Sequence, residues 1–505
     1  MPRPPRPRWD ERMTSSLWHR DQTSVDGTPF EPDARHDVVV VGAGITGLST
    51  AVMLAEAGVD VALVDAGEVG QGATGASVGM ASLLQGTTLA ALRAHHPAGL
   101  VKAYVDANRA GQEWLAERAG AAADRRTAFT FGRGIATDSA IDAVRDAARE
   151  AGLSVREDAP SDLGGRTPVR ALALDDQLAL DPAALSRTLA EAALAAGSTL
   201  HTGVRVTDVH ALPTGRVDTD HGTIFGDTIV LATGTPIARR GLYDLKTRAL
   251  RSWAVAFEME GDAEAPGGMW SEVGADGRSV VAAPSSFGRG VLLVTGARHP
   301  VGSAPSEVAL AEGLAAWARR TLPVGAELAR WSGQDYQSHN LVPFVGGMPR
   351  GLGRLRFATG YAGWGLTNGP AAAMRLTDEI RGVSRSDRPQ WMRTIGTRMT
   401  VPADLGRGIG EAGRRVGVAA GAFAAAAPAP VKRPAEGAGL VSRQGLRTAA
   451  VSTIEGQTRA VVAPAPLTWN DAERSWDSPV DGSRYAPDGT RLEGAASADL
   501  GVRGR

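Results

Sequence analysis

A glycine-rich turn between two apolar segments is the feature that most constrains the fold of this 505-residue chain. Four valines at 38–41 predict a strand that is buried on both faces of a parallel sheet. Gly42, Gly44 and Gly47 follow in G-x-G-x-x-G spacing and open a helical run, and a second apolar strand ends at Asp65, 18 residues after Gly47. Because strand, turn, helix, second strand and acidic residue occur in this order, we favour a Rossmann-like dinucleotide site over an ordinary βα turn. The pyrophosphate is expected at the helix N-terminus and the ribose at Asp65.

Three later segments indicate that the dinucleotide is FAD rather than a nicotinamide cofactor. A glycine-rich stretch at 66–77 stands where a dehydrogenase would continue its sheet, and it is suited to wrapping an extended cofactor. A buried strand at 228–234 ends in Ala-Thr-Gly after two short alternating strands, an order typical of flavoproteins. Residues 357–367 lead into a helix at 368–381, whose N-terminus is expected to stabilise negative charge on a reduced flavin ring. The predicted FAD-binding residues are Gly42, Gly44, Ile45, Thr46, Gly47, Asp65, Ala66, Thr74, Gly75, Ala76, Ser77, Val206, Ala232, Thr233, Gly234, Gly360, Gly363, Trp364, Gly365, Leu366 and Thr367.

The composition limits the partners and cofactors of the chain. It has 54 Lys and Arg against 55 Asp and Glu, so its net charge of −1 provides no overall field for nucleic acid or for an anionic membrane. The absence of cysteine excludes disulfides, a cysteinyl flavin link and cysteine-ligated iron–sulfur clusters, so FAD is expected to bind non-covalently. The N-terminus lacks the apolar core of a signal peptide, and the apolar stretch 416–431 is too short for a membrane span. We therefore expect a cytoplasmic protein with no membrane span.

Residues 36–382 resemble the D-amino-acid oxidase / glycine oxidase class of FAD-dependent oxidoreductases. The resemblance rests on the turn at 42–47, the Ala-Thr-Gly at 232–234, the sequence WSGQDY at 331–336 and the sequence GWGLTNG at 363–369. It implies an α/β fold in which a Rossmann-like FAD-binding domain is assembled from separate segments around an inserted α+β substrate domain. The implied chemistry is oxidation of the C–N bond of an amine or amino acid, with hydride transfer to flavin N5 and an imine product. A flavin enzyme acting on a C–OH bond and a non-catalytic flavoprotein scaffold are the alternatives.

Three residues are catalytic candidates, and each has a structural alternative. Arg251 lies in a stretch of alternating apolar residues, where its guanidinium would pair bidentately with a substrate carboxylate, although a surface arginine fits the same pattern. His339 lies in the loop after WSGQDY. The bacterial subgroup that the C-terminal tail resembles, described next, usually has Asp where this chain has Asn340, which weakens the case for cation recognition there. The resemblance places Tyr361 and Trp364 beside the flavin, although aromatic core packing explains both equally well.

The C-terminal tail is similar to a Rieske domain but lacks the ligands of the cluster. Such a cluster is held by two Cys and two His in C-x-H and C-x-x-H spacing. The residues that match its surroundings are Trp469, Asn470, Trp476, Gly482, Ser483 and Pro487. Alignment on these residues places the four ligand positions at Ala460, Val462, Ser478 and Asp481, and a bracing disulfide at Ala465 and Val480. The whole chain therefore resembles the bacterial subgroup with a C-terminal Rieske domain, here degenerate, with no metal site and no iron–sulfur cluster expected.

The chain is expected to divide into four parts. These are an N-terminal arm (1–35), the oxidoreductase (36–394), a helix and linker (395–435) and a small β Rieske-like domain (436–505). Within the oxidoreductase, the FAD-binding segments are expected at about 36–90, 185–240 and 335–385, and the substrate domain at about 91–184 and 241–334.

The missing ligands also bear on the electron acceptor. Without a cluster, a reduced flavin must pass its electrons to dioxygen, to a quinone or to a separate carrier protein. Dioxygen needs no docking surface, so we favour an oxidase that produces hydrogen peroxide, with a carrier-dependent dehydrogenase as the alternative. The expected substrate is a small-molecule amine or amino acid.

Overall fold

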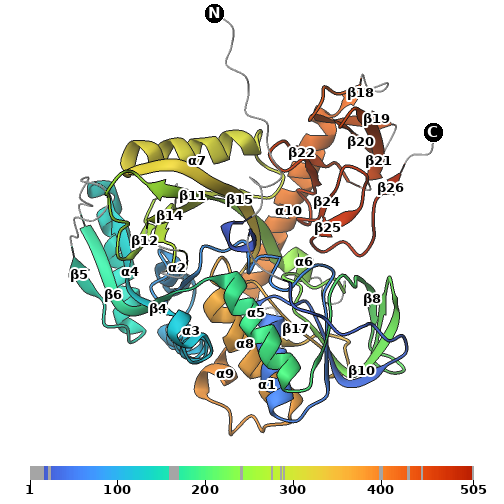
Figure 1. The fold of residues 1–505 in the computed structure, drawn as a ribbon, viewed down its shortest axis with the longest axis horizontal. Helices are drawn as coiled ribbons and strands as arrows, with labels where there is room; N and C mark the ends of the chain where they lie inside the picture. The colour runs from blue at the N-terminus through green and yellow to red at the C-terminus, as the bar shows by residue number, and fades with distance from the viewer. Residues whose placement is uncertain are drawn as a thin grey trace, which may run out of the picture.

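The computed structural model describes residues 16–502 apart from 21–23, 159–169, 239–240, 242, 275–276, 285–286, 288–289, 397–401, 429–432, 445–446 and 464. The described residues form three parts (Figure 1): a domain around a mainly parallel sheet, a domain around a mainly antiparallel sheet, and a small β domain at the C-terminal end. The predicted fold class is confirmed by this arrangement.

The first sheet has the order β16-β17-β10-β1-β2-β7, and the hairpin β8-β9 extends from β10. Its strands are β1 (Arg35–Val41), β2 (Val61–Val64), β7 (Thr199–His201), β8 (Val206–His210), β9 (Arg216–Thr219), β10 (Gly222–Leu231), β16 (Phe344–Gly347) and β17 (Leu355–Thr359). Valines 38–41 in β1 are at most 4% exposed. Alternate valines of this strand pack into two different apolar clusters, one on each face of the sheet. The prediction of a strand buried on both faces is confirmed.

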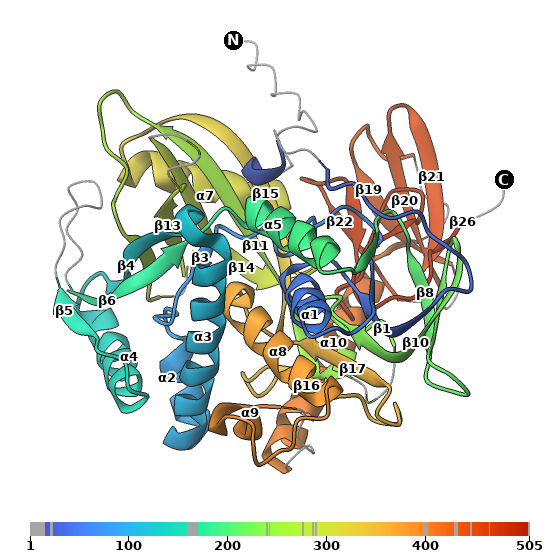
Figure 2. The ribbon, with the colours of Figure 1, turned by 60° about the horizontal axis from the view of Figure 1, so that its bottom comes forward.

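Helices α1 (Ile45–Glu56), α5 (Pro182–Ala195) and α8 (Gly365–Ile380) share the apolar cluster on one face of this sheet. Helix α5 begins at a strong start signal, because the Asp181 carboxylate accepts the N–H groups of Ala183 and Ala184 and Pro182 occupies the first turn. The long helix α3 (Ala98–Ala119) runs beside α8 (Figure 2). It therefore links the domain of the first sheet, called here the nucleotide-type domain, to the domain of the second sheet.

The second sheet has the order β15-β11-β14-β13-β12-β4-β6-β3, with β5 paired to β6. Its strands are β3 (Met80–Ala81), β4 (Asp124–Gly132), β5 (Arg156–Asp158), β6 (Arg170–Ala179), β11 (Thr247–Met259), β12 (Met269–Glu272), β13 (Ser279–Ala282), β14 (Val291–Pro300) and β15 (Val324–Ser338). Around this part lie α2 (Thr88–His95), α4 (Asp138–Glu150), α6 (Tyr243–Lys246), α7 (Glu307–Thr321) and α9 (Gln390–Thr394). Helix α7 covers one face of the sheet, because its buried Ala311, Leu314 and Ala315 pack against apolar residues of β11 and β14 (Figure 1).

The C-terminal part follows α10 (Pro402–Ala425) and contains two small sheets, with the orders β18-β19-β20-β21-β26 and β22-β23-β24-β25. Their strands are β18 (Ala427–Pro428), β19 (Gly439–Gln444), β20 (Arg447–Ile454), β21 (Gln457–Ala463), β22 (Thr468–Asn470), β23 (Ser475–Asp477), β24 (Arg484–Tyr485), β25 (Arg491–Glu493) and β26 (Gly501–Val502). Trp476 is fully buried between them, with its ring 4.7 Å from that of Trp469. These two tryptophans of the Rieske-like pattern therefore build the core of this part.

The N-terminal residues that the structure describes are packed against the body, unlike the arm predicted for 1–35. A short 3₁₀ helix, Leu17–His19, buries Leu17 and Trp18. The Thr28 N–H donates to the Leu200 carbonyl, and the Thr28 carbonyl oxygen lies 2.9 Å from the Nδ1 of the His201 side chain. Residues 1–15 and 21–23 of the predicted arm lie outside the described part. Within the described residues, no helix combines the length and the apolar character that crossing a membrane would require.

Candidate active site

Two of the three glycines of the predicted turn, Gly42 and Gly47, have no room for a side chain. Gly42 has φ of 108°, and a Cβ on it would lie 2.5 Å from the carbonyl oxygen of Ala232. A Cβ on Gly47 would lie 1.8 Å from the Gly42 carbonyl oxygen, so only glycine lets α1 start this close to the turn. A Cβ on Gly44 would meet only the Thr74 hydroxyl, at 3.1 Å. The turn therefore leaves a side-chain-free approach to the N-terminus of α1.

The polar groups around this helix start fit a dinucleotide pyrophosphate. Gly44 is the N-cap of α1 and supplies no side-chain cap, so the first turn offers backbone N–H groups and the positive end of the helix dipole. The Thr74 hydroxyl accepts the N–H of Ile45 at 3.0 Å, which brings the loop 72–77 directly over the helix start. Asp65 accepts the N–H groups of Ala43 and Gly67 at 2.6 and 2.8 Å, and burial raises the pKa of its carboxyl despite these bonds.

The predicted FAD residues meet at one edge of the first sheet. Strands β2, β1, β10 and β17 are parallel neighbours, so their carboxyl ends lie at the same edge. The segments that leave these ends contain Asp65 and Ala66 after β2, Gly42–Gly47 after β1, Ala232–Gly234 after β10, and Gly360–Thr367 after β17. Ligands of open α/β sheets bind at this edge. Val206 lies at the start of β8, and its carbonyl accepts a hydrogen bond from Arg491 of the C-terminal part at 3.0 Å.

The start of α8 lies against the start of α1. A Cβ on Gly369 would be 2.9 Å from the Ile45 side chain, so the two helices approach closely there. The Tyr361 hydroxyl lies 3.0 Å from the Thr46 hydroxyl, and burial raises the pKa of this phenol, which keeps it protonated. The indole of Trp364 donates to the Thr88 hydroxyl at 3.2 Å. The structure thus places Tyr361 beside Thr46, a predicted FAD-binding residue, and against the apolar cluster that contains the buried residues of α1.

A buried polar network that the sequence patterns did not reveal fixes the first turn of α8. The Tyr104 hydroxyl donates to the Gln85 side chain at 2.7 Å, and the Asn368 amide donates to that same hydroxyl at 3.2 Å. Asn108 donates to the Asn368 side-chain oxygen at 3.2 Å, and burial raises the pKa of Tyr104 to about 12. The sequence signal for this network is the spacing of Tyr104 and Asn108, four residues apart on the buried face of α3. Such a satisfied network rigidifies the helix start that would face a flavin.

Arg251 is placed away from the predicted carboxylate-binding role. Its side chain is 0% exposed, and its guanidinium pairs bidentately with Asp477 of the C-terminal part. It also donates to Glu307 and to Gln334, each at 3.3 Å. Burial alone would lower the pKa of Arg251, but the carboxylates of Asp477, Glu473 and Glu307 together outweigh it and raise that pKa. The guanidinium is therefore committed to the contact between the substrate-domain sheet and the C-terminal part.

His339 is packed between helix α6 and the edge strand β16. Its Nδ1 lies 2.8 Å from the Lys246 carbonyl oxygen, and its ring lies 5.7 Å from that of Phe344. Its Nε2 is buried without a hydrogen-bond partner among the described residues. This placement leaves the imidazole facing α6 and the core under β16.

The arginine next to the start of α8 is Arg298, which sequence analysis did not select. Its guanidinium donates to the Ala362 carbonyl at 3.0 Å and lies 3.5 Å from the Asp335 carboxylate. A Cβ on Gly363 would be 2.9 Å from the Arg298 Nη1. Burial raises the pKa of Asp335, and Arg298 opposes this shift. The Arg298 side chain is 35% exposed, so part of it can meet a ligand while the guanidinium pairs with Asp335.

The four Rieske ligand positions do not form a metal site. Ala460 and Val462 lie inside β21, which pairs with β20 along its length and with β26 at Val461 and Val462. Ser478 and Asp481 belong to a tight turn in which Gly482 donates to the Ser478 carbonyl at 2.9 Å. Alanine and valine carry no donor atom, so these residues do not fit a Cys₂His₂ cluster. Among the described residues, no group of three or more His, Cys, Asp or Glu side chains is arranged to bind a metal.

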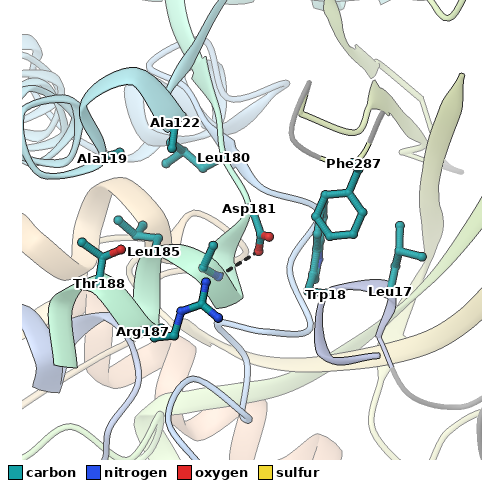
Figure 3. Close-up of a pocket in the computed structure, with 11 residues that line it drawn as sticks. Leu17, Trp18, Ala119, Ala122, Leu180, Asp181, Leu185, Arg187, Thr188 and Phe287 are labelled. Atoms are coloured by element: carbon teal, nitrogen blue, oxygen red, sulfur yellow. Dashed lines mark hydrogen bonds between the residues drawn. The ribbon is translucent and has the colours of Figure 1, made fainter. Parts of the chain in front are cut away.

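A pocket of ≈ 310 Å³ lies between the N-terminal 3₁₀ helix and the start of α5 (Figure 3). Leu17, Trp18 and Phe287 form one wall, and Asp181 and Arg187 lie on the α5 side. None of the predicted FAD-binding residues lines it.

Comparison with known protein families gives a match that includes both the glycine turn and the start of α8, which meet in the structure. The model of the family "FAD dependent oxidoreductase" (DAO) matches residues 37–379. The chain belongs to this family. Its predicted membership is confirmed, and the residues at the carboxyl edge of the first sheet lie within the matched region.

Individual relatives cover either the whole chain or its larger part. YhfW of Bacillus subtilis (strain 168), provisionally named a Rieske 2Fe-2S iron–sulfur protein, is 24% identical over 95% of this chain and 96% of its own length. Glycine oxidase from Geobacillus kaustophilus is similar in structure with a TM-score of 0.60 and 19% identity, covering 72% of this chain and 99% of the oxidase. L-amino acid deaminase from Proteus vulgaris has a TM-score of 0.60 and 16% identity, covering 73% of this chain and 99% of the deaminase. At these identities the structural matches show a shared fold.

Proposed function

We propose that this chain binds FAD non-covalently and oxidises the C–N bond of a small amine or amino acid. The observation that carries the proposal is the meeting of the glycine turn, Asp65 and the start of α8 at the carboxyl edge of four parallel strands. The names of the structural neighbours, glycine oxidase and L-amino acid deaminase, support the substrate class.

In this proposal bound FAD supplies the acceptor for a hydride from the carbon next to nitrogen, which leaves an imine to hydrolyse. The first turn of α1 would hold the pyrophosphate with backbone N–H groups, and Asp65 would accept from the ribose. The N-terminus of α8, fixed by Asn108 and Asn368, would place its positive dipole end where negative charge develops on reduction. Arg298 would hold a substrate carboxylate, since it is the arginine placed beside Gly363 and is partly exposed.

The cofactor half of the proposal is tested by denaturing the purified yellow protein in acid and filtering it. Flavin in the filtrate is the expected result, and flavin retained on the polypeptide would contradict non-covalent binding. A colourless protein would favour the flavin-free form of the scaffold alternative.

The substrate half is tested by anaerobic bleaching of the flavin with a panel of amines, D-amino acids, N-methyl amino acids and hydroxy acids. Bleaching by amines or amino acids is expected, whereas bleaching by hydroxy acids alone would show a C–OH enzyme. Bleaching by none of these compounds would favour a flavin-bearing scaffold. Arg298→Met is expected to raise KM for a carboxylate-bearing substrate about 10- to 100-fold, because a charged hydrogen-bond pair is lost. KM for an uncharged amine is the matched control and should stay unchanged.

We further propose that the electrons pass to dioxygen. The alanine and valine at two ligand positions support this, because they remove the intramolecular cluster as an acceptor. Rapid reoxidation of the substrate-reduced protein in air, with stoichiometric hydrogen peroxide, is expected. Slow reoxidation that an added quinone or carrier accelerates would instead identify a dehydrogenase.

A further inference from the structure

Two tryptophans from outside the nucleotide-type domain hold the loop at residues 72–77. The indole N–H of Trp18 donates to the Ser77 carbonyl at 2.7 Å, and that of Trp331 donates to the Ala76 carbonyl at 2.9 Å. Both side chains are buried, with exposures of 0% and 1%. We name Trp18 and Trp331 the indole pair.

The two members of the indole pair approach the loop from separate elements. Trp18 belongs to the N-terminal 3₁₀ helix and is fixed by the Phe287 ring, which meets it edge-on at 5.0 Å. Trp331 belongs to β15, whose neighbouring Gly333 lies so close that a Cβ there would be 3.1 Å from the Ala76 methyl group. The loop is therefore attached at its outer side to the N-terminal segment and to the substrate-domain sheet.

A third contact brings the N-terminal segment directly onto the loop backbone. A Cβ on Gly75 would lie 2.1 Å from the Nε2 of His19. Burial lowers the pKa of His19, so this imidazole is expected to be neutral at physiological pH. A neutral ring packs against the loop without adding a buried charge.

The inner side of the same loop touches the helix start where the pyrophosphate is proposed to bind. The Thr74 hydroxyl accepts the Ile45 N–H at 3.0 Å, and the Gly75 N–H donates to the Gly70 carbonyl at 2.7 Å. Movement of the loop would therefore open the proposed cofactor site. Without the indole pair, two partly buried carbonyl groups would lose their hydrogen-bond donors, and the closed position of the loop would be less favourable.

We propose that the indole pair positions the loop 72–77 and thereby slows release of the cofactor, so that the N-terminal segment 16–20 retains FAD. This inference rests on the proposed function, because it assumes that FAD lies between this loop and α1. Trp18 and Trp331 are positioning residues in this scheme: they act through the loop and take no part in the chemistry.

The test compares three full-length holoproteins, Trp18→Phe, Trp331→Phe and the control Trp317→Phe. Phenylalanine keeps an aromatic ring and removes the N–H donor. Trp317 lies on α7 with its ring 4.8 Å from the Arg278 guanidinium, and it packs in a different apolar cluster from Trp18, Trp331 and Ala76. FAD release is followed by the rise of flavin fluorescence after dilution, and the melting temperature of each flavin-free protein is measured in parallel.

Each variant of the indole pair is expected to release FAD about tenfold faster than the wild type, from the loss of one partly buried hydrogen bond. The control should stay within twofold, and the melting temperatures of the flavin-free proteins should not follow the release rates. Release within twofold of the wild type for both indole variants would overturn the inference while leaving the proposed function intact. A lowered melting temperature with unchanged release would also overturn it, by assigning the tryptophans a purely structural role.

Two further outcomes are separated by the design. If Trp18→Phe fails to fold, Trp331→Phe tests the positioning of the same loop through its other hydrogen bond, the one to the Ala76 carbonyl. A wild-type protein without flavin would overturn the proposed function itself, and the inference with it.

Discussion

The dinucleotide turn and the Rieske-like tail both carry a sequence pattern typical of a cofactor site, yet only the turn has the geometry of one. At the turn, Gly42 and Gly47 are held where a side chain would overlap backbone atoms. In the tail, Trp469 and Trp476 pack a small core, while Ala460 and Val462 lie in a regular strand. In the proposed function the glycines serve the ligand and the fold together, whereas the tryptophans serve the fold alone.

The difference shows which residues of a motif can change independently. A dinucleotide turn binds through backbone groups, so the residues that shape the backbone are also the residues that make the site. A cluster site binds through four side chains, and the surrounding residues can keep their packing after those side chains have changed. In this chain, Arg251 of the body pairs with Asp477 of the tail, directly before the predicted ligand position Ser478.

The largest expected effect is at the turn. Gly47→Ala places a methyl group 1.8 Å from the Gly42 carbonyl oxygen, so we expect loss of bound flavin and a free energy of unfolding lower by about 4 kcal/mol or more. Flavin absorbance and chemical denaturation measure the two effects. The control is Gly99→Ala, at a site with nothing within 4 Å of the added Cβ, and it should change stability by less than about 0.5 kcal/mol. A Gly47→Ala protein that keeps its flavin would contradict the cofactor site proposed here.

A smaller effect is expected at the contact between the tail and the body. Asp477→Asn removes the bidentate partner of the buried Arg251, and leaving that charge underpaired is expected to cost about 3 kcal/mol of folding free energy. Flavin content should stay at the wild-type level, because neither residue lies at the proposed cofactor site. The matched control is Arg93→Met, which breaks an exposed ion pair with Glu150 and should cost less than about 1 kcal/mol. Equal losses for the two variants would show that the Arg251 contact does not join the parts.

The same contact predicts a pH dependence through His299 and Glu307, whose side chains lie 2.9 Å apart. Burial disfavours charge on His299, but its bond to Glu307 outweighs burial and raises the pKa of His299 above 6.5. Burial likewise disfavours charge on Glu307, but His299 and Arg251 outweigh it and hold the pKa of Glu307 below 4.5.

The contribution of His299 to stability is therefore complete below pH 6.5 and is lost as the pH rises through its folded-state pKa. The contribution of Glu307 is present above pH 4.5 and is lost as the pH falls through its own folded-state pKa. Melting temperatures from pH 4 to 9 should show that His299→Gln loses stability relative to the wild type at pH 5 to 6, with a smaller difference at pH 9. A constant difference across this range would disprove the coupling.

The smallest expected effect comes from restoring the missing ligands. A chain carrying Ala460→Cys, Val462→His, Ser478→Cys and Asp481→His is expected to bind no stoichiometric iron, because residues 460 and 462 are fixed in the strand ladder of β21. Elemental analysis and electron paramagnetic resonance of the purified protein measure this outcome. A Rieske-type signal with two irons per chain would show that β21 rearranges into a ligand loop and that the tail retains a latent cluster site.

Local patterns predicted the elements around the cofactor site well, but they did not predict how side chains from distant segments combine. The valines of β1 and the glycines after it were recognisable because a buried parallel strand and a tight turn each impose residue types on consecutive positions. For Arg251, the alternating strand allowed either a substrate carboxylate or the surface, because the pattern indicates a face and says nothing about what covers that face. Asp477, 226 positions later, is what covers it. Trp18 was assigned to an arm for the same reason, since its partners lie at Ser77 and Phe287.

Residue types at short, fixed spacings were enough to predict the family and the strand–turn–helix unit, and the composition alone excluded cysteine ligands. The tertiary structure decided which arginine is buried in an ion pair and which is partly exposed beside α8. It also decided that Asp471 of the tail caps α7, by accepting the N–H groups of Glu307 and Val308. These outcomes depend on desolvation and on partners far apart in the chain, and neither property is set until the sheets pack together.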